Sequence, residues 1–381
     1  MGVEFISAIN VNASNELNRL GQASVDPAFF RTYVHALENA GFDYTLVPYF
    51  SAGQDPFAVA NAIVQQSERI APIVALRPNI MYPTVAAKAL ATLDQFGGGR
   101  VAVHFIAGGS DHEQGREGDF LTKEQRYDRE AEYIDVLRKV WASTEPFDHE
   151  GEYYQFRDFV SAVRPTHGTI PVSVGGSSAE AYRVGGSRGD IFGLWGEPLA
   201  DTREQIDRVY AEAEAAGRSD RPRIWVTFRP IIAATEELAW EKAHRTLEVL
   251  QGNKGKDPWK VVSLGGSNPA NVGSQRLLEI ASRQDVHDRA LWTPTASATG
   301  AQGASTALVG TPETVAAAIL DYVDLGADLI SIRGYDNLND LIDYGRYVLP
   351  LVRSELAHRE ATGQRGTLQA THLGALGVLA S

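Results

Sequence analysis

The sequence predicts an α/β fold, a TIM (β/α)8 barrel with insertions, and two patterns lead to this prediction. Eight apolar segments of strand length recur along the chain, and each is followed by a segment with apolar residues at helical spacing. The strand segments are too apolar to have a face in water, as expected of a parallel sheet covered by helices. Such strand–helix units make right-handed crossovers, and eight in series can close a barrel.

The clearest of these units lies at residues 72–109. An apolar run at 73–76 leads through a polar turn at 77–79 into a segment with apolar residues three and four apart. Three glycines at 97–99 end this predicted helix, and a second apolar run follows at 100–106. The segment therefore predicts one complete strand–helix–strand unit.

The remaining elements follow from the same signals. Asp26-Pro27 and Asp55-Pro56 each combine an N-cap residue with proline at the first helical position. We expect strands at 3–9, 44–47, 73–76, 100–106, 172–174, 190–195, 224–233 and 329–332. We expect helices at 27–40, from 56, from 85, and at 123–143, 179–184, 202–215, 236–250, 312–325 and 338–352.

One barrel domain is expected over residues 1–352, with a weakly specified tail at 353–381. Three stretches break the strand–helix rhythm and predict insertions at about 107–122, 145–168 and 252–305. The last is rich in Gly, Ser, Asn and Thr, with one helical piece expected near 274–282. Long stretches of this kind in compact domains are usually mobile lids or disordered. We expect a mobile lid after the seventh strand.

Composition excludes several classes of function. The chain has 35 Lys and Arg against 48 Asp and Glu, a net charge of −13, and no basic cluster that could bind nucleic acid. No apolar run approaches the ~18 residues of a membrane span. MGVEFISAIN lacks the basic segment of a signal peptide, so we expect a cytoplasmic protein. The absence of cysteine excludes disulfides, thiolate nucleophiles and Cys-ligated metals.

Residues at the carboxyl ends of barrel strands are the site candidates. Gly175, Gly176, Ser177 and Ser178 lie between a predicted strand and helix, where backbone N–H groups and hydroxyls can bind a phosphate. A plain tight turn is the alternative. Tyr127 lies early on the helix after the fourth strand, where its hydroxyl could reach the pocket mouth.

Three arginines, Arg77, Arg229 and Arg333, fall at strand ends and suggest an anionic ligand, although a strand-end arginine is often structural. His104 is more often a satisfied core histidine than a catalyst, and Trp195 is as consistent with packing as with a wall for a planar ring. Neither a metal-ligand spacing nor a Gly-x-Ser-x-Gly elbow occurs. We therefore expect no metal site, and chemistry supplied by an organic cofactor.

Several segments give the chain a family resemblance that extends over about residues 3–352. It resembles the bacterial luciferase-like superfamily, and within it the reduced-FMN-dependent alkanesulfonate monooxygenases. The segments are ALRPN at 75–79, TVAAKALATLDQFGGGR at 84–100, RYDREAEY at 126–133, VGGSS at 174–178, LWGEP at 194–198, GTPETVAAAILDYVDLG at 310–326 and RGYDNL at 333–338.

The resemblance implies a TIM barrel that receives reduced FMN from a separate NAD(P)H-dependent FMN reductase. Oxygen would add at flavin C4a, or at N5 as in some relatives, and the oxygenated flavin would attack a small-molecule substrate. In the sulfonate branch the C–S bond breaks to give an aldehyde and sulfite. The implied cofactors are reduced FMN and O2, and the implied assembly is a homodimer or homotetramer.

The resemblance also assigns roles by position. Gly175 to Ser178 and Tyr127 would bind the flavin phosphate, Asn79 would lie near the isoalloxazine edge, and His104 replaces an asparagine that faces the flavin. The residues expected to bind substrate are Asn10, Trp195, Arg229, Arg333 and Tyr335, and those expected to take part in catalysis are Arg229, His104 and Tyr335.

The chain also departs from the sulfonate branch. Its Arg-x-His pair on strand seven is Thr227 and Arg229 here, its first-strand histidine falls at about Asn10, and its strand-two cysteine at about Gly53. The lid segment ATGAQGAST lacks the branch's arginine, and a histidine two residues after the pocket tyrosine is Asn337. We expect Arg229 and Arg333 to rebuild an anion site in different positions.

Three other functions stay open on the same scaffold. The pocket could serve a sulfone, a thioether or a nitrogen compound. The protein could instead be a deazaflavin (F420)-dependent dehydrogenase or reductase, or a non-catalytic flavin-binding protein. The length of the expected lid favours the oxygenase, because an oxygenated flavin decays in contact with water.

Overall fold

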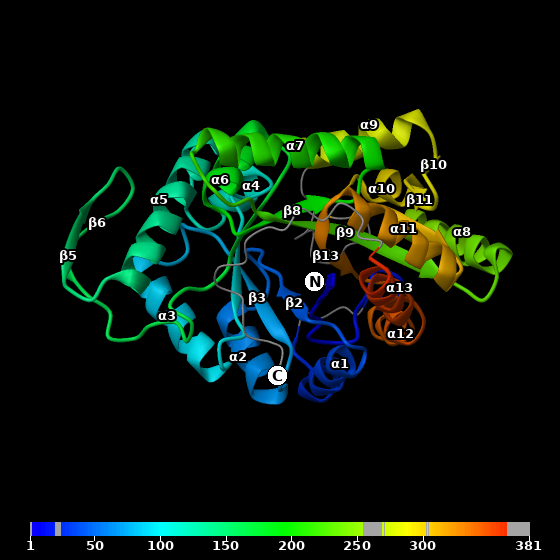
Figure 1. Ribbon diagram of the computed structural model, residues 1–381, viewed down its shortest axis with the longest axis horizontal. Coiled ribbons are helices and arrows are strands. Elements are labelled where there is room, and N and C mark those ends of the chain that lie inside the picture. Colours follow the sequence, from blue (N-terminus) through cyan, green and yellow to red (C-terminus); the bar gives the residue numbers. More distant parts are fainter. Residues whose placement is uncertain are drawn as a thin grey trace.

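The computed structural model describes residues 2–19, 24–253, 269, 271–301, 303 and 305–363. Within these ranges the protein is a closed barrel of eight parallel strands surrounded by helices (Figure 1). The barrel closes because β9 pairs with both β8 and β13. Its strands are β1 (Glu4–Ala8), β2 (Tyr44–Val47), β3 (Ala71–Leu76), β4 (Ala102–Phe105), β7 (Val172–Gly175), β8 (Ile191–Trp195), β9 (Arg223–Ile232) and β13 (Ala327–Ile332). The predicted fold class is confirmed.

Helices connect the barrel strands as the capping signals predicted. Asp26 accepts hydrogen bonds from the backbone N–H groups of Ala28 and Phe29, and Asp55 accepts one from that of Ala58. The helices that follow barrel strands are α1 (Pro27–Asn39), α2 (Pro56–Gln66), α3 (Pro83–Phe96), α5 (Lys123–Ala142), α6 (Ala179–Arg188), α7 (Leu199–Ala215) and α8 (Glu236–Gly252), and α11 (Pro312–Leu325) precedes the last strand.

The closing helix differs from the single segment expected at 338–352. It is divided into α12 (Asn337–Asp343), a π-helical turn at Tyr344–Val348, and α13 (Leu349–Ala361). Pro350 lies at the start of α13 and has no N–H to continue a regular helix, which fits a break at this point. The start of the expected tail is therefore helical, and residues beyond 363 lie outside the described residues.

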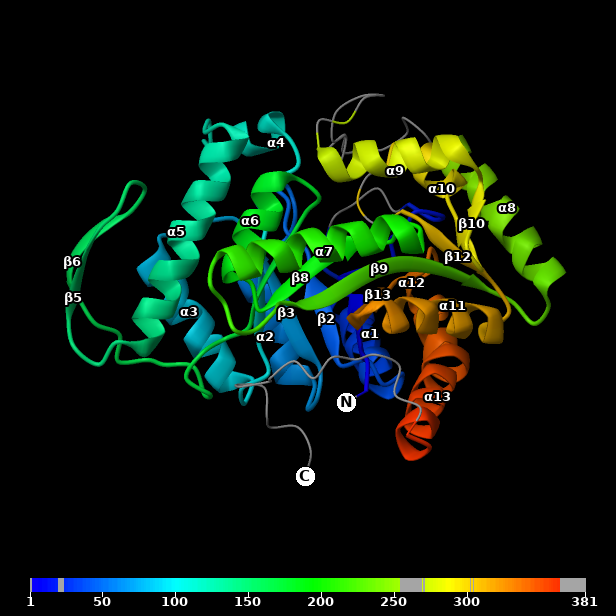
Figure 2. The same cartoon turned by 45° about the horizontal axis from the view of Figure 1, so that its top comes forward.

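Each predicted insertion carries its own elements. The first contains α4 (Asp111–Gly115), and the second contains a hairpin of β5 (Phe147–Glu150) and β6 (Gln155–Phe159) that projects from the barrel in Figures 1 and 2. The described part of the third contains α9 (Val272–Arg283), β10 (Val286–His287), β11 (Leu291–Trp292) and α10 (Pro294–Thr299). Residues 254–268 of the expected lid lie outside the described residues. A strand that was not predicted, β12 (Ala307–Gly310), pairs with the outer half of β9.

The interior of the barrel has a bulky floor and small residues above it. The floor is a cluster of inward-facing apolar side chains: Ile6, Ile73, Ala102, Ile191, Trp225 and Leu329. Because alternate residues of a strand share a face, the next inward positions are Ala8, Ala75, His104, Ser173, Gly193, Thr227 and Ser331. Four of them stay partly accessible to solvent: Ala8, His104, Gly193 and Thr227. The barrel therefore opens toward its carboxyl end above the floor.

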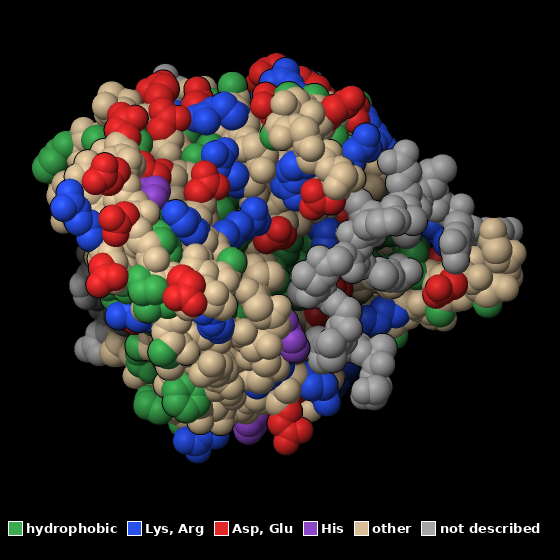
Figure 3. Space-filling model, turned by 60° about the vertical axis from the view of Figure 1, so that its left-hand side comes forward, with side chains coloured by type: hydrophobic (Ala, Val, Ile, Leu, Met, Phe, Trp, Pro, Cys, Tyr) green, Lys and Arg blue, Asp and Glu red, His purple; other side chains and the backbone are tan. Residues whose placement is uncertain are grey.

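The outer surface carries both signs of charge. On the face drawn in Figure 3, acidic and basic side chains are interspersed and neither sign forms a continuous field. No helix in the described ranges combines the length and the apolarity needed to cross a membrane.

Candidate active site

The carboxyl ends of the strands, together with α4 and α9 at the same end of the barrel, frame the candidate site (Figure 2). At one side lies the predicted phosphate-binding stretch. Ser178 caps α6 by accepting a hydrogen bond from the backbone N–H of Ala181 at 3.3 Å. Gly176 has a φ of 136°, which disfavours any residue with a side chain. A Cβ atom at Gly176 would lie 2.9 Å from the Cβ of Ala181 and 3.1 Å from the hydroxyl of Tyr127.

The hydroxyl of Tyr127 therefore lies beside the bare backbone at the start of α6. Burial raises the pKa of Tyr127 above its ordinary value, so the hydroxyl stays protonated and can donate a hydrogen bond. A helix of ten residues adds the N–H groups of its first turn and the positive end of its dipole. The structure thus brings together a hydroxyl from α5 and the loop after β7 in an arrangement suited to a phosphate.

His104 lies at the centre of the barrel mouth as a neutral ring. Its Nδ1 is 2.9 Å from the Oγ of Ser173, and its ring centroid is 5.3 Å from that of Trp225. Burial lowers the pKa of His104 to about 4, so the imidazole is uncharged at neutral pH. A Cβ at Gly175 would come within 3.0 Å of the Cε1 of His104, so glycine lets the backbone approach the ring.

Two polar side chains, one in the loop after β3 and one on β9, lack partners. Both side-chain amide atoms of Asn79 and the indole Nε1 of Trp225 are buried and form no hydrogen bond in the described part of the chain. An unsatisfied buried polar group costs about 1–3 kcal/mol, so such groups are expected where a ligand supplies the partner. The polar edge of a flavin ring carries donors and acceptors of the kind these groups need. The residues present therefore fit an FMN. The groups suited to its phosphate follow β7, and the groups suited to its ring lie after β3 and on β9.

Trp195 ends β8 and is covered by the insertion after β9. A Cβ at Gly273, in the first turn of α9, would lie 2.9 Å from the Cζ3 of Trp195 and 3.5 Å from the Oγ of Ser177. The start of α9 therefore borders both the indole and the phosphate-binding stretch. The sequence indicates a helical piece near 274–282, which α9 confirms, but it does not show what the start of that helix contacts.

Of the three strand-end arginines, Arg77 has the structural role. It is buried, ion-paired with Glu113 at 3.0 Å and with Glu117 at 2.9 Å, and stacked over the ring of Tyr49 at 5.0 Å. Its charge is thus balanced by α4 and the residues after it. The suggestion that Arg77 joins an anion site is not supported by this geometry.

Arg229 and Arg333 do come together, and an acid lies between them. Arg229 is 2% exposed, donates hydrogen bonds to Glu16 and to the carbonyl of Gly334 at 2.8 Å, and stacks on the ring of Tyr335 at 3.7 Å. Arg333 is 3.6 Å from the same carboxylate. Burial alone would raise the pKa of Glu16, but the charges of Arg229 and Arg333 outweigh it and lower that pKa to about 2.

Asn10 and Tyr335 differ in whether their polar groups already have partners: the amide of Asn10 is used by its own loop, whereas the buried hydroxyl of Tyr335 has no hydrogen-bond partner in the described chain. The side-chain amide of Asn10 donates to the carbonyl of Ser14 at 3.3 Å and so holds the loop after β1. Tyr335 is buried, and its ring is covered by Arg229; burial, opposed by that arginine, raises its pKa. Glu16 and Ser173 were missed by sequence reasoning. The only available signal was their position near strand ends.

No group of three or more potential ligands that could hold a metal ion occurs among the described residues. The polar groups at the mouth are a neutral imidazole, buried amide and hydroxyl groups, and a guanidinium pair with one carboxylate.

Comparisons with known proteins agree with this architecture. The model of the luciferase-like monooxygenase family matches residues 9–329. EDTA monooxygenase (EmoA) from Chelativorans sp. BNC1 has 18% identity, covers 93% of this chain and 94% of its own, and has a TM-score of 0.73. DmoA from Hyphomicrobium sulfonivorans has 19% identity, coverages of 93% and 89%, and a TM-score of 0.72.

A coenzyme F420-dependent tetrahydromethanopterin reductase from Methanopyrus kandleri is also similar, with 17% identity, coverages of 92% and 99%, and a TM-score of 0.65. At these identities the solved structures show a shared fold and leave the cofactor and substrate of this chain open. The family match, which spans most of the chain, shows that the protein belongs to the luciferase-like monooxygenase family.

Proposed function

We propose that this protein is the oxygenating component of a two-component flavin monooxygenase. It would use reduced FMN and O2 to oxygenate a small organosulfur compound, an alkanesulfonate cleaved at the C–S bond to an aldehyde and sulfite. Family membership supports a flavin-dependent monooxygenase. A separate NAD(P)H-dependent FMN reductase would supply the flavin in the cytoplasm, and the chain would act as a homodimer or homotetramer.

The observation that carries the proposal is the hydroxyl of Tyr127 next to the backbone of Gly176 at the start of α6. These groups would hold the FMN phosphate, together with Ser177 and Ser178. Asn79, whose amide has no partner in the described chain, would bind the polar edge of the flavin ring. The small residues above the barrel floor would leave room for that planar ring.

The other residues would position the substrate and exclude water. Bound reduced flavin supplies the electrons that activate O2. Neutral His104 would orient the ring through hydrogen bonding, and its low pKa means that it carries no positive charge at neutral pH. Trp195 and the start of α9 would shield the mouth from water. Arg333, with Arg229 behind it, would bind the anionic head of the substrate.

Anaerobic titration with reduced FMN and, separately, with reduced F420 tests the proposal. We expect tight binding of reduced FMN and, on mixing with oxygen in a stopped flow, a transient oxygenated-flavin spectrum. Sulfite and aldehyde should then form from an alkanesulfonate in a panel that also contains sulfones, thioethers and amines. Tight binding of F420 without binding of FMN would overturn the proposal and indicate hydride transfer. If another compound of the panel were oxygenated instead, only the proposed substrate would change, and the assignment as a flavin monooxygenase would stand.

A further inference from the structure

The loop after β1 places a carboxylate between the two arginines that were expected to form an anion site. Glu16 pairs with Arg229, and its other carboxylate oxygen is 3.6 Å from Arg333. These three residues come from the carboxyl ends of β1, β9 and β13, which are neighbours in the barrel. The group therefore belongs to the barrel mouth, where the substrate is proposed to bind.

Glu16 is held in this place by its own loop and by the rest of the protein. The side chain of Asn15 accepts hydrogen bonds from the backbone N–H groups of Leu17 at 3.0 Å and Asn18 at 2.6 Å. The carbonyl of Glu16 accepts a hydrogen bond from Asn253, at the end of α8, at 3.2 Å. Leu17 packs against the apolar cluster that includes Tyr335. The carboxylate is thus a fixed part of the mouth.

The charges of this group do not cancel. Two guanidinium groups contact one carboxylate, and the charge of Arg19 also helps to lower the pKa of Glu16, so at least one positive charge is left over. Arg229 is buried against Glu16, whereas 36% of the Arg333 side chain is accessible to solvent. The charge of Arg229, and then burial, lower the pKa of Arg333, as expected when Glu16 does not fully balance the two cations. The uncompensated charge is therefore presented at Arg333.

We propose that Glu16 is a built-in counter-ion that sets the charge of the substrate, so that the mouth accepts a single anionic group and rejects dianions. This inference rests on the proposed function, because it concerns the substrate of the same site. A first anionic group would meet the accessible guanidinium of Arg333. A second anionic group would have to lie near the carboxylate of Glu16. Repulsion between the two negative charges and the loss of their hydration would oppose its binding.

Binding of two probes that differ by one charge tests the inference. Ethanesulfonate and ethane-1,2-disulfonate are titrated calorimetrically into the full chain under anaerobic conditions, with and without reduced FMN. We expect the wild type to bind ethanesulfonate at least about tenfold more tightly, as like-charge repulsion of this kind predicts. Glu16→Gln should make ethane-1,2-disulfonate the tighter ligand, because the arginines then lack their negative counter-ion. Glu150→Gln, which removes an exposed acid paired with Arg157 on the projecting hairpin, should leave it unchanged.

A second variant keeps the test decisive if Glu16→Gln fails to fold because Arg229 loses its buried partner. Arg333→Gln leaves the pair of Arg229 and Glu16 intact and should weaken ethanesulfonate binding by about tenfold or more. Equal binding of the two probes to the wild type, no binding of either, or an unchanged affinity in Arg333→Gln would overturn the inference. Failure of reduced FMN to bind would contradict the proposed function and not this inference. The two outcomes can be told apart because the titration without flavin measures anion selectivity by itself.

Discussion

Tyr127 shows how one side chain can report on the proposed phosphate site. Its hydroxyl would lie 3.1 Å from a Cβ at Gly176, so only the glycine backbone leaves space for a ligand oxygen there. Its position in the chain, early on the helix after the fourth strand, was enough to predict that it reaches the pocket. The sequence could not show which backbone atoms it would face.

Tyr127→Phe should weaken the binding of reduced FMN by about tenfold, since a hydrogen bond to a charged group contributes roughly 1.5–3 kcal/mol. Binding of reduced riboflavin, which has no phosphate, should not change. Both affinities are measured by anaerobic fluorescence titration. Tyr210→Phe, which removes a hydroxyl from the outer helix α7, is the matched control. An equal loss of affinity for both flavins would place the hydroxyl away from the phosphate.

Glu130 is a buried carboxyl group that the proposed mechanism does not use. Neither oxygen has a hydrogen-bond partner in the described chain, and the side chain has no exposed surface. Burial, opposed by the charge of Arg129, raises the pKa of Glu130 from 4.5 to about 8. In the folded state the group is therefore protonated at neutral pH, whereas in the unfolded chain it is ionised.

This difference makes stability fall as pH rises. Between pH 4.5 and about 8 the folded state holds a proton that the unfolded state has lost, so the free energy of unfolding should fall by up to about 1.4 kcal/mol per pH unit. Glu130→Gln should remove this dependence and be more stable than the wild type at pH 8. Urea unfolding of both proteins at pH 5 and pH 8 measures how the free energy of unfolding depends on pH. Glu241→Gln, at an exposed position on α8, should retain the wild-type slope.

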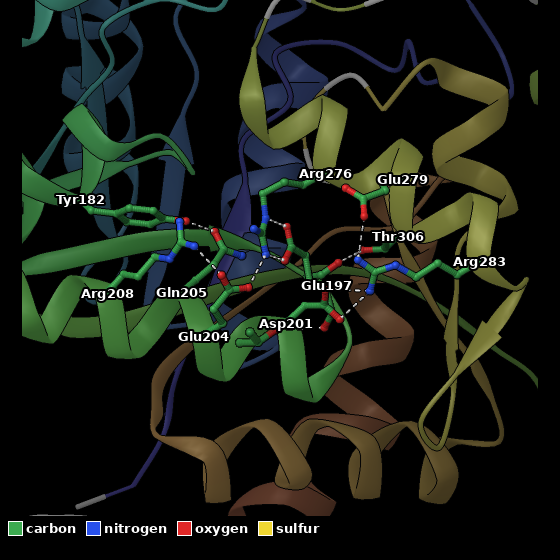
Figure 4. A network of polar contacts seen from close by, with 12 residues as sticks. Tyr182, Glu197, Asp201, Glu204, Gln205, Arg208, Arg276, Glu279, Arg283 and Thr306 are labelled. Atoms are coloured by element: carbon green, nitrogen blue, oxygen red, sulfur yellow. Dashed lines mark hydrogen bonds and ion pairs between the residues drawn. The ribbon is translucent and has the colours of Figure 1, made fainter.

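Helix α9 is fastened to the barrel by the polar network in Figure 4. Arg276 on α9 donates two hydrogen bonds, at 2.9 and 2.7 Å, to Glu197, which follows β8 and is 1% exposed. A second, more exposed pair joins Arg283 to Asp201 at the start of α7. Since the first turn of α9 covers Trp195, this network fixes one wall of the candidate site.

Arg276→Gln should loosen α9, because breaking a buried ion pair from one side costs about 3–5 kcal/mol. Amide hydrogen exchange in α9 should then accelerate by about a hundredfold or more, while exchange in α6 stays at the wild-type rate. Arg283→Gln removes a half-exposed pair on the same helix, worth about 1 kcal/mol or less, and should accelerate exchange only slightly. If the two variants behaved alike, the buried pair would not be what holds the helix.

The closed barrel brings distant parts of the chain to one rim. Glu16 and Arg229 are 213 residues apart in sequence, yet they meet because β1 pairs with β13 and β13 pairs with β9. The same closure sets the phosphate-binding stretch after β7 across the mouth from this group. The proposed flavin and the proposed anion site thus share one opening, as an oxygenase acting on a small anion requires.

Local sequence signals are enough to predict the order and type of the barrel elements. Apolar periodicity, Asp-Pro helix starts and glycine helix ends are local signals, so they predicted all eight barrel strands and the helices between them. The same local information placed Tyr127, His104 and Gly175 to Ser178 at the mouth, because every carboxyl end of a parallel barrel strand lies there.

Which charged side chains meet depends on the three-dimensional fold. Arg77, Arg229 and Arg333 look alike in the sequence, but Arg77 is balanced by Glu113 and Glu117, whereas Arg229 and Arg333 share Glu16. Likewise, the neighbouring sequence does not show that Glu130 is buried without a partner or that Gly273 contacts Trp195. Ion pairing and desolvation depend on what lies within a few ångströms, and in a closed barrel those neighbours come from distant parts of the chain.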